Sequence, residues 1–273
     1  MGWEAVKKLP MRKTNGNELW SGDPKVMEKG NPTKITRRQH IFPRSVIEGF
    51  ADKNGKVKVV PVSGKPIYFA SSHDPRFTVE RLWDQKCEEH SNELYEAPFH
   101  LLAQKLLATN TQQLNSDEGH VASGMYGLWR ARTRLKRNPP IDSVLTALSC
   151  PKSASGWSQS EGEQLEKAGF VLTQEISNDG HPIVRSRFNV WPKLLKEVEL
   201  FKRNYQNYNW AVLNDNARQI VIPDQCPETI AIPLSPTRCL AMINPNSDMK
   251  KLSTDSLSER LKSAAKVYWI QAT

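Results

Sequence analysis

Lys34-Ile-Thr-Arg-Arg-Gln-His40-Ile-Phe-Pro43-Arg-Ser-Val-Ile-Glu-Gly-Phe50 is the stretch from which the rest of the chain can be interpreted. A basic cluster leads into His40, and Pro43 follows before a short apolar run that ends at Phe50. Because proline disfavours helical geometry in the residue before it, we expect His40 at the end of a strand or extended segment, with a helical turn after Pro43. A histidine in this setting can be a general base, a metal ligand or a phosphate contact, or a polar group that fixes the segment on the core.

The segments on either side of this stretch predict an α+β fold. Alternating β-branched residues over 56–62, a turn signal, and a second strand over 65–70 predict a hairpin. Apolar residues at helical spacing predict helices over 80–107, 120–136, 159–168, 191–205 and 254–265. Pro98 is expected to kink or divide the first of these helices. The remaining short elements are a helix over 141–148, strands over 170–176 and 267–270, a hairpin of 210–213 with 219–222, and a strand pair of 230–234 with 239–243. The expected architecture is a helical middle flanked by small antiparallel sheets.

The predicted domain organisation is an irregular basic arm over residues 1–33, followed by a single compact α+β domain over 34–273 with a possible seam near 150–157. No apolar run approaches the roughly 18 residues that a membrane-spanning helix requires, and the first residues lack the apolar core of a secretory signal. Four scattered cysteines without a Cys-x-x-Cys pair argue against a disulfide framework or a structural zinc site. We therefore expect a cytoplasmic protein with no membrane partner.

The charge balance favours a polyanionic partner. Lys and Arg number 38 against 29 Asp and Glu, which gives a formal net charge of +9. The excess is concentrated in residues 1–66 and 126–138, while 84–96 is acidic, so nucleic acid is the expected partner and a protein partner is the alternative. Six arginines are candidate phosphate contacts: Arg37, Arg38, Arg44, Arg130, Arg134 and Arg137. The competing interpretation is that the arginine helix pairs internally with the acidic helix.

The sharpest functional hypothesis is a metal-dependent nuclease acting on DNA or RNA. His40 is its candidate general base, and Arg132 a candidate phosphate-holding catalytic residue. Glu89, Glu93 and Glu96 lie at helical spacing and are candidate ligands for a divalent cation, Mg²⁺ or Mn²⁺.

Asp224 is either a second site residue meeting His40 or a turn-capping carboxylate. The alternative function is a non-enzymatic protein that binds nucleic acid or protein. In that case His40, Arg132 and Asp224 form a structural polar network, and no cofactor is needed. Gly-rich phosphate-binding patterns are absent.

The order of these features resembles a known family. His40-Ile-Phe-Pro43 followed by Phe50 is similar to the opening of the domain-of-unknown-function 4238 family, whose members typically begin HHYVPRFYLRNF. The segment over 127–133, the Asp-x-x-Pro turn at Asp224, and Ile232-Pro-Leu-Ser-Pro236 also resemble family motifs, so the likeness spans residues 34 to the end. Gln39 stands where the family has its first histidine, and Pro223 where it has a serine. The resemblance implies a fold rather than a reaction. With the charge, it favours a defence or toxin effector.

Overall fold

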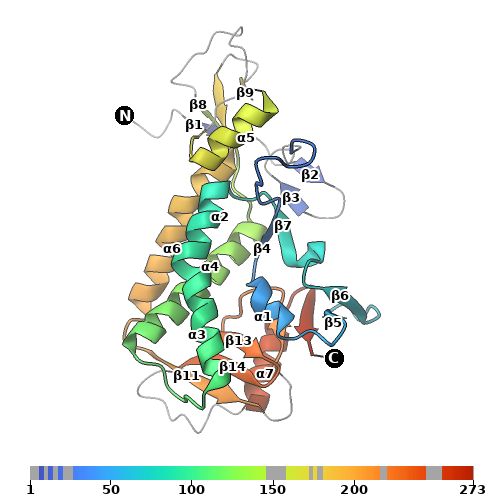
Figure 1. Cartoon of the computed structure of the whole chain (residues 1–273), viewed down its shortest axis with the longest axis vertical. Coiled ribbons are helices and arrows are strands. Elements are labelled where there is room, and N and C mark those ends of the chain that lie inside the picture. Colours follow the sequence, from blue (N-terminus) through green and yellow to red (C-terminus); the bar gives the residue numbers. More distant parts are fainter. Residues whose placement is uncertain are drawn as a thin grey trace. The chain divides into compact units, whose positions relative to one another are not determined.

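The computed structural model describes residues 27–145, 158–171, 181–215, 220–243 and 254–272, together with short strands at 6–8, 12–14, 18–20 and 175–176. Helices occur together with small antiparallel sheets, so the predicted α+β class is confirmed (Figure 1). The chain folds into two compact units, one made of residues 1–39, 79–91 and 134–194 and the other of 40–78, 92–133 and 195–273. The seam predicted near 150–157 lies outside the described residues.

The sheet of the first unit has the strand order β1-β8-β10-β9, with antiparallel neighbours throughout. Its strands are β1 (Val6–Lys8), β8 (Ser143–Leu145), β10 (Pro182–Val184) and β9 (Glu175–Ile176). A separate pair is formed by β2 (Arg12–Thr14) and β3 (Glu18–Trp20), so the arm predicted as irregular includes short strands. The helix predicted over 141–148 is wrong for the described residues, because Val144 is buried and pairs with both neighbouring strands of this sheet.

A helix of the first unit has capping residues at both ends, and other helices begin in the same unit. Helix α5 (Gln159–Ala168) starts with a capping box, in which Ser158 Oγ accepts the Glu161 N–H at 3.3 Å and Glu161 accepts the Ser158 N–H at 2.8 Å. It ends at Gly169, whose φ of 93° lies in the left-handed region that favours glycine. Helix α2 (Gln85–Ser91) packs on α5. A short 3-10 turn, η4 (Ser186–Asn189), leads into α6 (Val190–Asn204).

The helical layer of the second unit is closely packed. Helix α4 (Ser116–Arg137) approaches α6 so closely that a Cβ on Gly127 would lie 3.1 Å from Val198 Cα. Aromatic rings fill the space around them, with Phe42 4.4 Å from Trp129 between ring centroids. The helix predicted over 80–107 begins only at Gln85, because Glu80 ends a strand. A π-helical turn, η3 (Asn92–Glu96), follows α2, and α3 (Ala97–Ala108) then begins with Pro98 in its first turn, near the predicted division.

Two sheets complete the second unit. One has the order β11-β14-β13, formed by β11 (Asn209–Asn214), β14 (Arg238–Ile243) and β13 (Ala231–Ser235). The hairpin predicted for 210–213 with 219–222 is therefore wrong, because β11 pairs with β14. The other has the order β12-β15-β5-β6, formed by β12 (Ile222–Pro223), β15 (Tyr268–Gln271), β5 (Lys56–Pro61) and β6 (Tyr68–Ser71). The closing helix is α7 (Thr254–Ala264).

Candidate functional site

His40 lies where the sequence places it, at the end of a strand. It closes β4 (Arg38–His40), which pairs with β7 (Thr78–Glu80) after the 3-10 turn η2 (Pro75–Phe77). Pro43 then caps the short helix α1 (Arg44–Glu48), as its fixed φ allows. The Nε2 atom of His40 lies 3.0 Å from the Ser72 carbonyl oxygen. A carbonyl oxygen only accepts hydrogen bonds, so Nε2 carries the proton and Nδ1 of the neutral ring keeps its lone pair.

The surroundings of His40 favour its neutral form. Burial lowers the pKa of His40 below its ordinary value, and the hydrogen bond to the Ser72 carbonyl and the charge of Glu96 only partly offset that effect. The positive charges of Arg44 and His73 lower this pKa further. At neutral pH, His40 is therefore an uncharged imidazole with one basic nitrogen.

Polar side chains from α1 and from the loop after β6 lie around this histidine. Arg44 Nε donates to Glu48 Oε1 at 2.7 Å, and Ser72 Oγ donates to the same oxygen at 3.1 Å. Burial alone would raise the pKa of Glu48, but these two hydrogen bonds outweigh it and the pKa is lowered. His73 directly follows Ser72 and is exposed. We call His40, Arg44, Glu48, Ser72 and His73 the His40 cluster.

The pH dependence of stability follows from the lowered pKa of His40. As the pH falls below about 6.5, the unfolded chain takes up a proton at this histidine before the folded chain does. The stability contributed by neutral His40 is therefore complete above about pH 6.5 and is lost as the pH falls toward the folded-state pKa. We expect the free energy of unfolding, measured with urea between about pH 7 and about pH 5, to fall less steeply in His40→Gln than in the wild type. Equal slopes in the two proteins would contradict this.

The predicted metal ligands do not form a cation site. Glu89 is held by Lys86 Nζ at 2.8 Å and by Gln85 Nε2 at 3.2 Å, Glu96 is paired with Arg132, and Glu93 is exposed. The π-helical turn changes the helical register between residues 89 and 96, so the single carboxylate face expected from regular spacing is not kept. In the part of the chain that the structure describes, no group of three or more His, Cys, Asp or Glu side chains can hold a metal ion. The predicted Mg²⁺ or Mn²⁺ therefore has no fitting donor set there.

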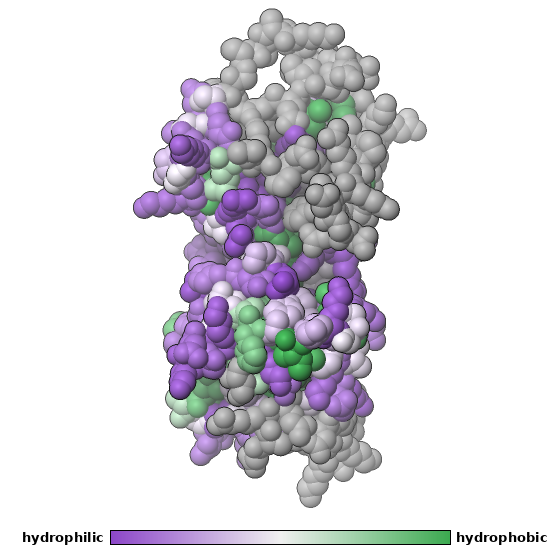
Figure 2. Space-filling model, turned by 90° about the vertical axis from the view of Figure 1, so that its right-hand side faces the viewer, coloured by the Kyte–Doolittle hydropathy of each residue, from purple (hydrophilic) through white to green (hydrophobic). Residues whose placement is uncertain are grey.

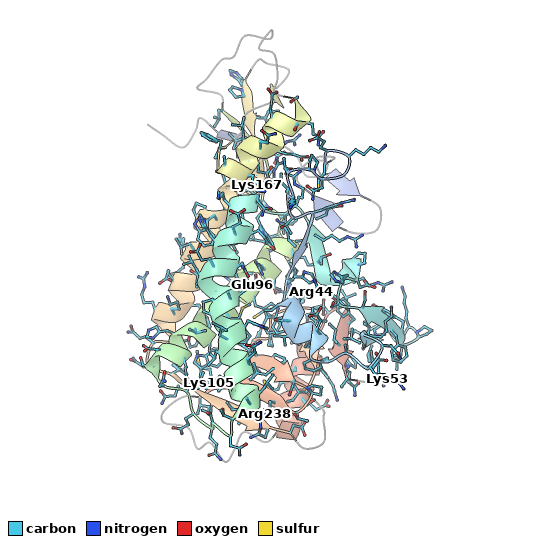
Figure 3. All side chains as sticks on the ribbon, viewed as in Figure 1. Arg44, Lys53, Glu96, Lys105, Lys167 and Arg238 are labelled. Carbon is cyan, nitrogen blue, oxygen red and sulfur yellow. The ribbon has the colours of Figure 1, made fainter. Side chains whose placement is uncertain are left out.

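Arg132 and Glu96 form a buried ion pair. The side chain of Arg132 is 1% exposed and that of Glu96 21% exposed. Figure 3 labels Glu96 where η3 meets α3, and Arg44 on α1. Because the Arg132 guanidinium is enclosed in the core, its placement suits a structural ion pair better than contact with an external phosphate.

The other predicted arginines are distributed over several elements. Arg37 is paired with Glu80, and Arg38 is exposed at the start of β4. On α4, Arg134 and Arg137 are exposed and Arg130 is half-buried.

Asp224 acts as a cap. Its Oδ1 accepts the N–H groups of Lys266 at 2.8 Å and Val267 at 3.3 Å, and its own N–H donates to the Tyr268 carbonyl at 3.1 Å. These bonds fix the chain between α7 and β15. The geometry corresponds to the turn-capping alternative.

A second candidate surface was not recognised from the sequence. In β5, Val57 and Val59 are buried, so Lys56, Lys58 and Val60 point to the opposite face of the sheet. Lys58 pairs with Phe69 of β6 on one side and Gln271 of β15 on the other, while Val60 pairs with Trp269. Paired residues share a face. We call Lys56, Lys58, Val60, Phe69 and Trp269 the outer sheet face.

The outer sheet face combines apolar and basic groups. Phe69 is 59% exposed, and at the same end of the unit Ile67, Val62 and Val267 are at least 45% exposed. Figure 2 looks at the side of the molecule where β5 and β6 lie, and hydrophobic atoms there are surrounded by hydrophilic ones. The signal in the sequence is the alternation of lysine with valine in β5, which places the lysines on one face of the strand.

Comparison with family models, with curated proteins and with solved structures finds no match. The resemblance to the domain-of-unknown-function 4238 family therefore stays a prediction. None of the helices in the described ranges has the length and apolar character needed to cross a membrane.

Proposed function

We propose that the protein binds single-stranded nucleic acid on the outer sheet face. The observation that carries the proposal is the pairing of Phe69, a 59% exposed aromatic ring, with Lys58 across adjacent strands, with Lys56 two residues further along β5. Bases of single strands stack on exposed aromatic rings, and lysines beside the ring hold the phosphates.

The single-stranded form is favoured because stacking requires an unpaired base. A base in a duplex is already stacked and paired, and only a strand with unpaired bases can place one on Phe69. Lys56 and Lys58 are about 7 Å apart along β5 and point to the same face, so both can contact one extended strand. The partly exposed Trp269 extends the apolar surface beyond Val60.

The distribution of charge supports a polyanion as the occupant. Several arginines pair inside the units: Arg81 and Arg187 with Glu166, Arg132 with Glu96, and Arg185 with Asp142. In contrast, Lys56 and Lys58 make no ion pair with any residue that the structure describes, and neither do Lys53 and Lys65 on the adjoining turns. Their charge is available for a ligand, in a chain whose formal net charge is +9.

Fluorescence anisotropy with labelled single-stranded RNA, single-stranded DNA and duplex tests this proposal. We expect single strands to bind more tightly than duplex, and Phe69→Ala to weaken binding by about 1–3 kcal/mol, or roughly 5- to 150-fold. Phe170→Ala is a matched control, because Phe170 is also 59% exposed but lies in the other unit.

The salt dependence of binding distinguishes the phosphate contacts of the lysines from the stacking of a base on Phe69. In the variant with both Lys56→Ala and Lys58→Ala, the slope of log affinity against log salt should become shallower by about 1.4, or about 0.7 for each lost phosphate contact. Phe69→Ala should leave the slope unchanged. No binding by the wild type, or equal loss in Phe69→Ala and Phe170→Ala, would refute the proposal. Capture of a protein through this face would indicate the protein-binding alternative.

A further inference from the structure

The His40 cluster lies at the end of the same edge strand that carries Phe69. Strand β6 ends at Ser71, and Ser72 and His73 follow directly. His73 is four positions after Phe69, a span of at most about 14 Å of extended chain. A strand bound on the outer sheet face thus lies within a few nucleotides of two histidines that come from distant parts of the sequence.

We propose that the His40 cluster cleaves bound RNA by metal-independent transesterification, with His40 as general base and His73 as general acid. This rests on the proposed function, because the outer sheet face supplies the substrate. His40 Nδ1 takes the proton of a ribose 2′-hydroxyl, and the 2′-oxygen forms a bond to the adjacent phosphorus. The bond from phosphorus to the 5′-oxygen breaks, and His73 protonates that oxygen. The products are a 2′,3′-cyclic phosphate and a 5′-hydroxyl, and no metal, water or oxidant is consumed.

The hydrogen bonds of His40 suit this role. The Ser72 carbonyl holds the proton on Nε2 and fixes the plane of the ring, and among the described residues the ring makes its hydrogen bond through Nε2, not through Nδ1. A general base needs such an unprotonated nitrogen, fixed in orientation, to accept a proton from the substrate. His73 is exposed to solvent, which an acid that must be reprotonated after each turnover requires.

Arg44 supplies the positive charge for the phosphate. Its side chain is 48% exposed and bonds to Glu48 through Nε alone, so both terminal nitrogens can donate to phosphate oxygens. Glu48 is itself held by Ser72 Oγ, and it therefore positions the guanidinium next to the loop that carries His73. The requirement for a 2′-hydroxyl makes RNA, and not DNA, the substrate.

The cleavage test uses the full chain, end-labelled single-stranded RNA and an excess of EDTA. We expect cleavage in EDTA, a 2′,3′-cyclic phosphate product identified by mass spectrometry, and no cleavage of DNA or of the same RNA with 2′-O-methyl groups. His40→Gln and His73→Gln should each lower the rate by at least about a hundredfold without weakening RNA binding. His100→Gln, at an exposed histidine of α3, should cleave as the wild type does and controls for contaminating ribonuclease.

The rate should rise with pH as His40 loses its proton. The charges that act on His40 are those of Arg44 on α1, Glu96 on η3 and His73, and Arg44 is paired with Glu48; none of these groups is altered in the His100→Gln control. Since His73 is exposed, His73→Gln tests the proposal even if His40→Gln fails to fold.

The binding and cleavage results together show which of the two proposals fails. RNA that is bound but intact would overturn the cleavage proposal and leave the proposed function standing. Cleavage that EDTA abolishes, or that persists in both histidine variants, would also overturn it. The absence of both binding and cleavage would overturn both proposals.

Discussion

Arg132→Met is expected to lower the free energy of unfolding by about 3–5 kcal/mol, because it leaves the mostly buried Glu96 carboxylate without its cation. The Arg132 side chain is 1% exposed, so water cannot replace the ion pair from that side. Urea unfolding of the purified variant measures the loss. Arg137→Met is the matched control on the same helix, and because Arg137 is exposed its replacement should change stability by less than about 0.5 kcal/mol.

A double-mutant cycle shows whether the ion pair is the cause. The variant that combines Arg132→Met with Glu96→Gln carries no buried charge at this position, so it should be more stable than the sum of the two single changes predicts. The alternative is the phosphate-holding role that the sequence suggests for Arg132. If Arg132→Met were as stable as the wild type but bound nucleic acid more weakly, Arg132 would be a phosphate contact and our structural interpretation would be wrong.

Local patterns were sufficient to predict the longer helices and the first hairpin. Helix α5 occupies the predicted residues 159–168, because its capping residues and its periodic face lie within one short segment. The β5–β6 hairpin follows from alternation and a turn in neighbouring residues. Pairing between strands that are distant in the sequence cannot be predicted from patterns in neighbouring residues. Strand β5 pairs with β15 at the far end of the chain, and β11 pairs with β14 instead of the segment that follows it, because partners are chosen by burial in the whole unit.

The candidate site also combines features that local patterns predict with features that depend on long-range pairing. The strand-end position of His40 follows from Pro43 and could be predicted, but its partners Ser72 and His73 reach it only through the pairing of β4 with β7. The arrangement of the acidic helix cannot be predicted from spacing for a related reason. Spacing along one helix shows which carboxylates are neighbours, but it does not show that Lys86 and Arg132 occupy two of them, or that a π-helical turn intervenes.

Replacing Glu166 should have a comparably large effect in the other unit. Glu166 Oε2 accepts from Arg187 Nη2 at 3.1 Å and also pairs with Arg81, and the Glu166 side chain is only 2% exposed. Burial lowers the pKa of Arg187, and the charge of Glu166 partly offsets this, so the carboxylate is what makes two buried guanidinium groups tolerable. Glu166→Ala should therefore cost about 3–5 kcal/mol.

The matched control for this prediction is Glu161→Ala on the same helix. Glu161 is exposed and only takes part in capping α5, so its loss should cost much less in urea unfolding than the loss of Glu166. Replacing Arg81, Glu166 and Arg187 together by Met, Leu and Met removes all three charges and should recover most of the stability, because well-packed apolar groups can substitute for a buried charge cluster. If Glu166→Ala cost no more than Glu161→Ala, the two arginines would have to find other partners. In that case the cluster would not be what holds α5 to the segment that carries Arg81.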